Sequence, residues 1–434
     1  MSRAGAVSRR DFMRTGAGAG AALGGLAILG ATARGQAAKA FKVGLIGCGG
    51  RGRGALGDIL NAGKALNVDL RVVALADAFP DKVAATRGML KGKGQDVPEA
   101  QCFTGFDAYK KLIATDVEIV LMCTSPTFRP VHFEAAVQAG KHIFVEKPVA
   151  VDPVGCRRMF AAGAEAAKKG IGVLAGTCLR HEKGYGGLRQ LIADGAIGRP
   201  LGGVTYYCIG RLGFVPRAEG WSDAEYMVRN WYSFAEMSGD HIVEQDVHTI
   251  DMQNWCMGAT PLAAVGIGAR HRRQTGDQYD CFSVDYEYPG QVHVHNICRQ
   301  INGCWNWGNG IHLTGEKGWA RIGAGVTLWD GTKVPPPAIE VHGSMYVQEH
   351  YVLLDSLLKG TPINNAKDVT EASLTAILGR TAAYTGRKVE WKELVDPAAK
   401  SDLYGLAFKP SPEDFEAGQV TAPKDGEAPV PGKA

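Results

Sequence analysis

Beyond its first 37 residues, the chain lacks both a charge imbalance and a long apolar run. The whole sequence holds 48 Lys and Arg against 44 Asp and Glu. Residues 1–37 contain five of the Arg and one of the Asp, so the remainder carries 43 of each sign. A balanced surface does not favour a polyanion, and we predict no nucleic-acid partner. After residue 37 no apolar run is long enough to cross a bilayer.

Cysteine motifs are also missing, although the chain has 10 Cys. No Cys-x-x-Cys pair occurs, which argues against a zinc site of the cysteine type, and we predict no bound metal. Five of the cysteines lie in or beside apolar runs and are predicted to be buried as small hydrophobic residues: Cys48, Cys123, Cys178, Cys208 and Cys298. A single disulfide remains the alternative.

Residues 1–37 are typical of a twin-arginine signal peptide. Arg9 and Arg10 precede an Ala-, Gly- and Leu-rich run from Thr15 to Ala33, and small residues near Ala37 suit a peptidase. We therefore expect export to the periplasm by the twin-arginine machinery and no stable membrane span after cleavage. Retention as an uncleaved anchor is the alternative. Because this route carries folded proteins, it favours a cofactor that stays bound.

The next segment, residues 40–178, alternates apolar strands with helices. Strands are predicted at 41–47, 70–76, 117–123, 143–145 and 172–176, and helices at 54–62, 81–91, 131–139 and 153–168. This alternation predicts an α/β Rossmann domain with a doubly wound parallel sheet.

Residues 179–400 have a different pattern, with β-forming runs near 203–209, 263–269, 282–288, 292–300, 310–314 and 318–322. Many alternate apolar and polar residues, which predicts an α+β domain with a large, mostly antiparallel open sheet. Helices are expected at 185–194, 346–359 and 371–385. Residues 405–434 have little to bury, and we predict an extended or disordered tail.

A Gly-rich turn follows the first strand as Gly47-Cys48-Gly49-Gly50-Arg51-Gly52. A G-x-G-x-x-G turn between a strand and a helix is typical of dinucleotide binding, because its glycines let a pyrophosphate approach the helix N-terminus. Asp77 ends the second strand, where a carboxylate accepts hydrogen bonds from the adenosine ribose. We therefore predict NAD, with NADP as the alternative, and assign Gly47, Gly49, Gly50, Arg51, Gly52 and Asp77 to its binding. A turn without a ligand is the competing interpretation.

The motif Glu146-Lys147-Pro148 follows another strand, at the carboxyl edge where ligands bind in open α/β sheets. A lysine there could hydrogen-bond a reacting hydroxyl and lower its pKa. Taken alone, Lys147 is better interpreted as a surface residue.

Together these motifs resemble the Gfo/Idh/MocA oxidoreductases, over residues 41–394. The resemblance rests on Gly47–Gly52, on Cys123-Thr124-Ser125-Pro126, and on the run from Ala139 to Pro148. It implies that Lys147 is catalytic and that Thr124, Ser125, Pro126, Glu146 and Lys147 itself lie at the cofactor. It also implies a homodimer or homotetramer.

The family carries an Asp and a His four residues apart, and here these positions hold Glu244 and His248. On one helix they would share a face. Histidine has a pKa suited to accepting a hydroxyl proton, so we predict catalytic roles for both. Asp240 is expected to cap the helix. Metal binding by His241 and His248 is the alternative, although no third ligand is evident.

Four further residues are predicted to contact the substrate: Arg180, His181, Tyr185 and Trp231. The favoured function is an NAD(P)-dependent oxidoreductase acting by hydride transfer on a secondary hydroxyl of a sugar or polyol. Two alternatives remain open. One is a redox-neutral glycosidase that oxidises the 3-hydroxyl transiently, and the other is a cofactor-binding protein without catalysis.

Overall fold

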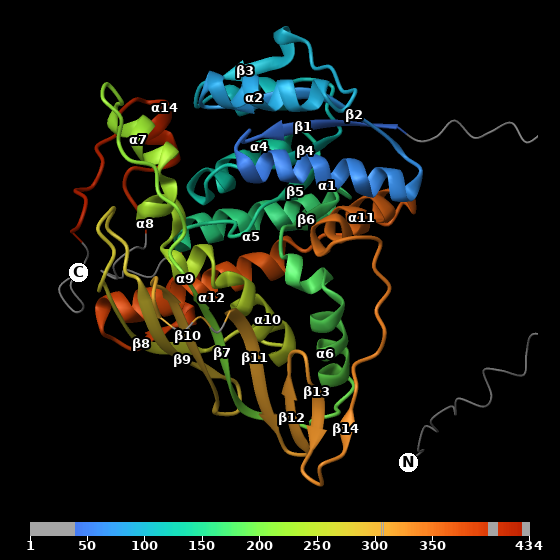
Figure 1. Cartoon of the computed structure of the whole chain (residues 1–434), viewed down its shortest axis with the longest axis vertical. Coiled ribbons are helices and arrows are strands. Elements are labelled where there is room, and N and C mark those ends of the chain that lie inside the picture. The colour runs from blue at the N-terminus through green and yellow to red at the C-terminus, as the bar shows by residue number, and fades with distance from the viewer. Residues whose placement is uncertain (1–39, 305, 307, 398–406, 428–434) are drawn as a thin grey trace, which may run out of the picture. The chain divides into compact units, whose positions relative to one another are not determined.

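The computed structural model describes residues 40–304, 306, 308–397 and 407–427. They belong to one compact unit that begins at Lys39 (Figure 1). The predicted signal peptide lies outside the described residues, as do parts of the predicted tail. Within the described part, no helix is long and apolar enough to span a membrane.

The first half forms a six-stranded parallel sheet in the order β3-β2-β1-β4-β5-β6. The strands are β1 (Ala40–Ile46), β2 (Asp69–Asp77), β3 (Cys102–Thr104), β4 (Ile119–Met122), β5 (His142–Val145) and β6 (Val173–Ala175). The helices between them are α1 (Gly50–Leu66), α2 (Pro80–Lys91), α3 (Ala108–Ile113), α4 (Arg129–Gln138) and α5 (Pro153–Lys168). The predicted Rossmann fold is confirmed.

Successive side chains of this sheet enter two different cores, which explains its continuous apolar strands. In β4, Ile119 and Leu121 pack with α1 and α2, whereas Val120 and Met122 pack with α3, α4 and α5. Helix α1 starts at Gly50, four residues before the predicted start, so that the second half of the Gly-rich motif forms its first turn.

The second half builds a nine-stranded sheet in the order β14-β13-β12-β11-β7-β10-β9-β8-β15. Only β7 and β10 pair in parallel among its described strand pairs, so the predicted mostly antiparallel sheet is confirmed. Its strands are β7 (Pro200–Ile209), β8 (Ala263–Ala269), β9 (Cys281–Tyr288), β10 (Val292–Gln300), β11 (Gly308–Gly315), β12 (Gly318–Arg321), β13 (Gly325–Leu328), β14 (Lys333–Val334) and β15 (Val389–Glu390).

Helices α6 (Lys183–Ala193), α10 (Val247–Met257) and α12 (Ala366–Thr385) pack on the inner face of this sheet. Helix α11 (Met345–Leu358) instead returns to the first half, where Leu353, Leu354 and Leu357 join the core of α1 (Figure 1). The Rossmann core is therefore completed by a segment from the far end of the chain.

The tail differs from the prediction. Residues 407–427 are ordered against the first half, with a short helix α14 (Pro412–Glu416) that Ser411 caps. Phe415 is 2% exposed and packs against Phe106 and Phe128 at ring distances of 5.3 and 5.0 Å. This buried aromatic residue, which average composition does not reveal, docks the segment together with ion pairs from Lys110 to Glu416 and from Arg158 to Glu413.

The segment between β7 and α10 contains α7 (Asp223–Arg229), α8 (Ala235–Ser238) and α9 (His241–Glu244), and the tail fastens it from outside (Figure 1). Asp425 accepts hydrogen bonds from Tyr226 Oη at 2.8 Å and from Gly276 N at 2.5 Å. Asp223 accepts one from Ala422 N at 3.1 Å. Helix α13 (Trp391–Val395) follows β15 and is the last described helix before the tail.

Candidate active site

The Gly-rich turn has the geometry that a pyrophosphate needs. Gly47 has φ +96°, and a Cβ there would lie 2.6 Å from the Cys123 carbonyl carbon. A Cβ on Gly52 would lie 1.9 Å from the Gly47 oxygen. Around Gly49 and Gly50, by contrast, a Cβ would meet nothing within 4 Å, so the first turn of α1 faces open space. Amide donors at a helix N-terminus facing such a space suit an anion.

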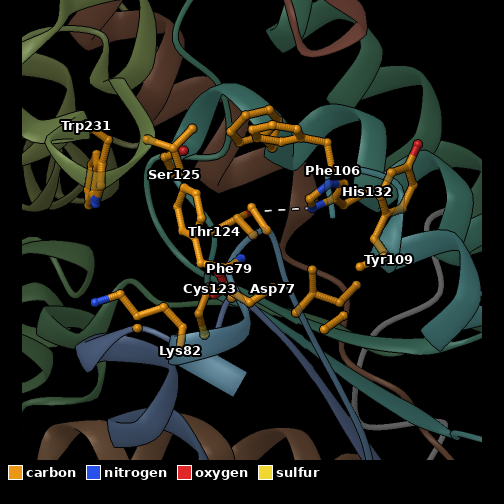
Figure 2. Close-up of a pocket in the computed structure, with 18 of the residues that line it drawn as sticks. Asp77, Phe79, Lys82, Phe106, Tyr109, Cys123, Thr124, Ser125, His132 and Trp231 are labelled. Carbon is orange, nitrogen blue, oxygen red and sulfur yellow. Dashed lines mark hydrogen bonds between the residues drawn. The ribbon is translucent and has the colours of Figure 1, made fainter. Parts of the chain in front are cut away.

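A pocket extends from this turn along the carboxyl edge of the sheet (Figure 2). Its walls come from both halves of the chain, since Val228, Arg229 and Trp231 line it opposite Asp77 and Phe79. Arg229 closes the outer wall. Its guanidinium bonds both carboxylate oxygens of Asp81, at 2.8 and 3.1 Å, and stacks on the Phe79 ring at 4.0 Å.

Asp77 lies where the sequence predicts, at the wall of this pocket. Its Oδ2 accepts from Cys48 N at 2.7 Å and its Oδ1 from Phe79 N at 3.0 Å. Burial raises the pKa of Asp77. Each carboxylate oxygen retains a second acceptor site, which a ribose hydroxyl would fill. Lys82 lines the same end of the pocket.

Thr124 and Ser125 line the pocket, whereas Pro126, also predicted to lie at the cofactor, is not among its lining residues. Thr124 Oγ1 lies 3.4 Å from His132 Nδ1, as Figure 2 shows. Within the described residues, the buried Ser125 Oγ has no hydrogen-bond partner. Pro126 begins a 3-10 turn that directs Phe128 to the pocket wall. A buried hydroxyl without a partner beside an open glycine cradle fits a polar ligand such as a dinucleotide.

Lys147 and Glu244 meet at the boundary of the two halves. Lys147 Nζ donates to the Glu244 carbonyl at 2.7 Å and to Glu244 Oε1 at 3.1 Å. The lysine is 9% exposed and the glutamate 3%. Glu244 Oε2 is buried and, within the described residues, has no hydrogen-bond partner. A buried ion pair with a partnerless oxygen suits a site that still has to receive a donor.

The prediction that Glu244 and His248 share one continuous helix is wrong. The helix breaks at Gln245 and Asp246, between α9 and α10. In a continuous helix the Glu244 carbonyl would accept from the His248 amide. Here Lys147 Nζ donates to the Glu244 carbonyl. His248 N donates instead to the backbone carbonyl of Gln245, at 3.3 Å. The lysine, 97 residues away in sequence, thus replaces a helical hydrogen bond.

His248 nevertheless lies at the same site. Its Nδ1 is 4.0 Å from Cys178 Sγ. Burial lowers the pKa of His248 well below its ordinary value, and the positive charges of Lys147 and Arg51 lower it further. The imidazole is therefore neutral near pH 7 and has one nitrogen able to accept a proton. The negative charge of Glu244, together with burial, raises the pKa of Tyr232, which keeps this phenol protonated.

Asp240 caps α9 as predicted, accepting from His241 N at 2.5 Å. The His241 ring lies between Asp240 Oδ1, at 3.2 Å, and Cys298 Sγ, at 3.4 Å, within the core. No group of three His, Cys, Asp or Glu side chains able to hold a metal occurs among the residues that the structure describes.

Two of the predicted substrate contacts are engaged elsewhere in the structure. Arg180 forms a bidentate ion pair with the buried Asp251, at 2.7 and 2.8 Å, and a further bond to Asp368 at 2.9 Å. Tyr185 is buried and donates to Asn309 Oδ1 at 2.6 Å. These contacts tie the entry of the second domain together, because a buried polar group needs a fixed partner.

The other two predicted contacts remain closer to open space. His181 is half-buried, and burial together with Arg180 lowers its pKa to about 4. Trp231 lines the dinucleotide pocket and stacks on Tyr232 at 3.8 Å. The structure thus places Trp231 at the cofactor side of Tyr232.

Glu146 and Arg51 face each other, and neither is among the residues that line the pocket. Arg51 Nε donates to Glu146, and its other nitrogens reach Asp58 at 3.0 Å and Glu349 at 3.3 Å. Glu349 was not predicted to belong to the site. The sequence does contain a local indication of its role. Glu349 shares a helix face with Leu353 and Leu357, and a charged side chain within such an apolar stripe needs a partner.

The fold and these groups define the class: a two-domain dinucleotide-binding protein with a lysine at the domain boundary. Residues 41–173 match the model of an oxidoreductase family with an NAD-binding Rossmann fold, and residues 185–321 match the GFO/IDH/MocA C-terminal domain. Together these matches cover more than half of the chain in the family's own order. The chain belongs to the Gfo/Idh/MocA oxidoreductase family, and its first domain is an NAD-binding domain.

Individual relatives are more distant. An uncharacterized oxidoreductase of Streptococcus pneumoniae is 26% identical over 217 residues, which is 49% of this chain and 54% of that protein. Inositol 2-dehydrogenase of Klebsiella pneumoniae is 33% identical over 133 residues, 30% of this chain and 36% of that enzyme. The chain thus spans about half or less of these relatives. The fold resembles aldose-aldose oxidoreductase from Caulobacter crescentus, with a TM-score of 0.64, 20% identity, and coverage of 81% of this chain and 100% of that one.

Proposed function

We propose that the protein is an NAD-dependent oxidoreductase that acts on a secondary hydroxyl of a sugar or polyol. The observation that carries the proposal is the buried Lys147 ammonium, held by the carbonyl oxygen and the carboxylate Oε1 of Glu244. The sugar-related names of the relatives support the substrate class. The open glycine cradle supports a dinucleotide, and Asp77 favours NAD over a 2′-phosphorylated cofactor.

Three groups have distinct tasks in this reaction. Two of the three Lys147 donors bond to Glu244, and the third is available for the substrate hydroxyl oxygen. That contact stabilises negative charge on the oxygen as its proton departs. Neutral His248 accepts the proton, and Glu244 holds the ammonium in place. When bound, the nicotinamide would take the hydride from the same carbon.

The proposal is tested by the absorbance of the purified full-length protein in the reduced-nicotinamide band, before and after a panel of sugars and cyclitols. A sugar-dependent rise with NAD is expected. If dinucleotide binds and no member of a broad panel changes the band, the oxidoreductase function is rejected and the cofactor-binding protein without catalysis is favoured.

A second function is favoured by one observation, the protonated Tyr232 phenol next to Glu244. A transient oxidation at the sugar 3-hydroxyl, elimination of the aglycone, addition of water and return of the same hydride would cleave a glycoside without net redox change. Tyr232 would protonate the leaving oxygen. Catalytic release of phenol from aryl glycosides without net NADH formation would identify this activity, whereas stoichiometric NADH formation would identify the dehydrogenase.

We also propose export by the twin-arginine route, which rests on Arg9 and Arg10 ahead of the apolar run. Replacing both arginines with lysine is expected to retain the protein in the cytoplasm, as judged by cell fractionation. Continued export of that variant would contradict the proposal.

A further inference from the structure

Arg51 occupies the Gly-rich turn, but its side chain serves a different part of the site. It is the second residue of α1, next to glycines whose backbone faces the pocket. Its guanidinium extends toward three carboxylates from three elements: Asp58 of α1, Glu146 after β5, and Glu349 of α11. The Tyr346 ring lies 4.9 Å from its central carbon. The Arg51 guanidinium thus connects the Gly-rich turn, the segment Glu146–Pro148 and helix α11.

The carboxylate nearest the chemistry is Glu146. It is 5% exposed, its Oε2 accepts from the Lys147 amide at 3.3 Å, and its amide bonds to the Met122 carbonyl at 2.9 Å. Gly176 leaves space for it, because a Cβ there would lie 2.6 Å from Glu146 Oε2. Glu146 is therefore packed in one position, with Arg51 Nε as its charged partner.

The three carboxylates differ in how readily they carry a negative charge, and this decides which of them balances the positive charge of Arg51. Burial raises the pKa of Glu349 well above its ordinary value, and the negative charge of Glu146 raises it further. Glu349 Oε2 is buried and has no hydrogen-bond partner among the described residues. Burial and Glu146 thus disfavour a negative charge on Glu349, whereas Glu146 and the more exposed Asp58 also pair with Arg51.

We propose that Arg51 is a positioning residue for the reaction: it neutralises Glu146 so that the neighbouring Lys147 ammonium stays on Glu244 and faces the substrate. Without Arg51, Glu146 would lose its ion-pair partner. Two cations would then be available to it: Lys147, the next residue in the chain, and the buried Arg129, whose charge interacts with Glu146. This inference rests on the proposed function, since it assigns Lys147 the catalytic role.

The test compares Arg51→Met, Glu146→Gln and the double variant in the full-length protein. Each has two readouts, the NADH dissociation constant by fluorescence and the single-turnover rate of nicotinamide reduction. Arg51→Met is expected to slow reduction about 100-fold, as for a misplaced catalytic group, while the dissociation constant stays within about 3-fold. The double variant, which removes both charges, is expected to recover about 10-fold of the lost rate.

Two variants serve as comparisons. Glu349→Gln removes the carboxylate whose charge burial and Glu146 already disfavour, so it is expected to slow reduction less than Arg51→Met does. Arg158→Met is the matched control, because Arg158 also bonds two carboxylates, Glu134 and Glu413, away from the site. If Arg51→Met destabilises the protein, Gly176→Ala displaces Glu146 without removing any charge and is expected to slow reduction in the same way.

Three results would overturn the inference. They are an unchanged reduction rate in Arg51→Met, a loss of NADH affinity as large as the loss of rate, or no recovery in the double variant. A crystal structure of Arg51→Met gives a readout that needs no substrate, since Lys147 Nζ is expected to leave Glu244 for Glu146. If the wild type reduces no nicotinamide with any sugar, the proposed function fails, while the position of Lys147 still decides the role of Arg51.

Discussion

The lysine site at the boundary of the two halves and the dinucleotide pocket are held in different ways. At the lysine site, Lys147 and Glu244 have side chains that are 10% and 4% exposed, and each is fixed by short contacts. At the adenosine end, Arg229 pairs with Asp81, whose side chain is 53% exposed, and the docked tail supports the outer segment. Exposed ion pairs contribute little to the free energy of folding, whereas breaking a buried ion pair destabilises the protein strongly. The buried contacts thus fix the position of Lys147, whereas the exposed contacts at the adenosine end would allow the cofactor to enter.

The comparison predicts its largest effect at Glu244. Glu244→Gln keeps the shape and the carbonyl contact but leaves Lys147 without its buried counterion. Nicotinamide reduction in a single turnover is expected to slow about 100-fold, with the NADH dissociation constant within about 3-fold of wild type. Glu244→Asp, which keeps the charge and shortens the side chain, is the matched control and is expected to lose less. Equal losses in both variants would show that position rather than charge matters.

At the adenosine end, Asp77→Ala removes the acceptor proposed for the ribose. NAD affinity, measured by fluorescence titration with NADH, is expected to fall about 10- to 100-fold, the range for a hydrogen bond to a charged group. Affinity for NADPH should fall less, because a repulsive carboxylate is also removed. Equal losses for the two cofactors would contradict a ribose contact and leave Asp77 only its bonds to Cys48 N and Phe79 N.

The dinucleotide pocket is also lined by His132, whose pKa burial lowers to about 3. The unfolded chain binds a proton at an ordinary pKa of about 6.5, so the stability from the neutral ring is present above that pH and is lost as pH falls toward 3. At pH 5 this histidine is expected to reduce the free energy of unfolding by about 2 kcal/mol. His132→Phe keeps the stacking on Tyr109 and should flatten the denaturation profile between pH 7 and 5. An unchanged slope would mean that this histidine is not the group responsible.

The tail gives the smallest predicted effect. Phe415→Ala removes the aromatic anchor and should release the segment that fastens α7, so NADH dissociation in stopped flow is expected to quicken about 10-fold. Asp81→Asn removes only an exposed pair, and its effect is expected to stay near 2-fold. Glu427→Gln, which removes only an exposed ion pair with Lys424 within the tail, is the control. If Phe415→Ala leaves dissociation unchanged, the tail does not restrain cofactor exchange.

Much of the fold could be predicted because its strands and helices repeat a clear pattern. The predictions for α5, β8 and β10 match the structure residue for residue, since each combines a sustained period with turn residues at its ends. Strands of two to four residues, such as β3 and β14, are too short to show a period. Helix α14 was missed because Phe415 is its only buried residue.

The site residues also differ in whether a local sequence pattern reveals them. Gly47–Gly52, Asp77 and Lys147 could be found because each follows a strand at the carboxyl edge of one sheet. The break between Glu244 and His248 could not, since it depends on a lysine 97 residues away. The contact of Arg51 with Glu349 joins residues 298 apart, and no local pattern records such a pair.

The central claim is that Lys147 performs chemistry and does not bind the cofactor. It is tested most directly by comparing Lys147→Met with the wild type at equal dinucleotide occupancy, following reduced nicotinamide in one turnover with a sugar found active in the panel. We predict that the variant binds NADH within about 3-fold of wild type and reduces nicotinamide at least about 1000-fold more slowly. Reduction at the wild-type rate, with the dinucleotide bound, would contradict the account.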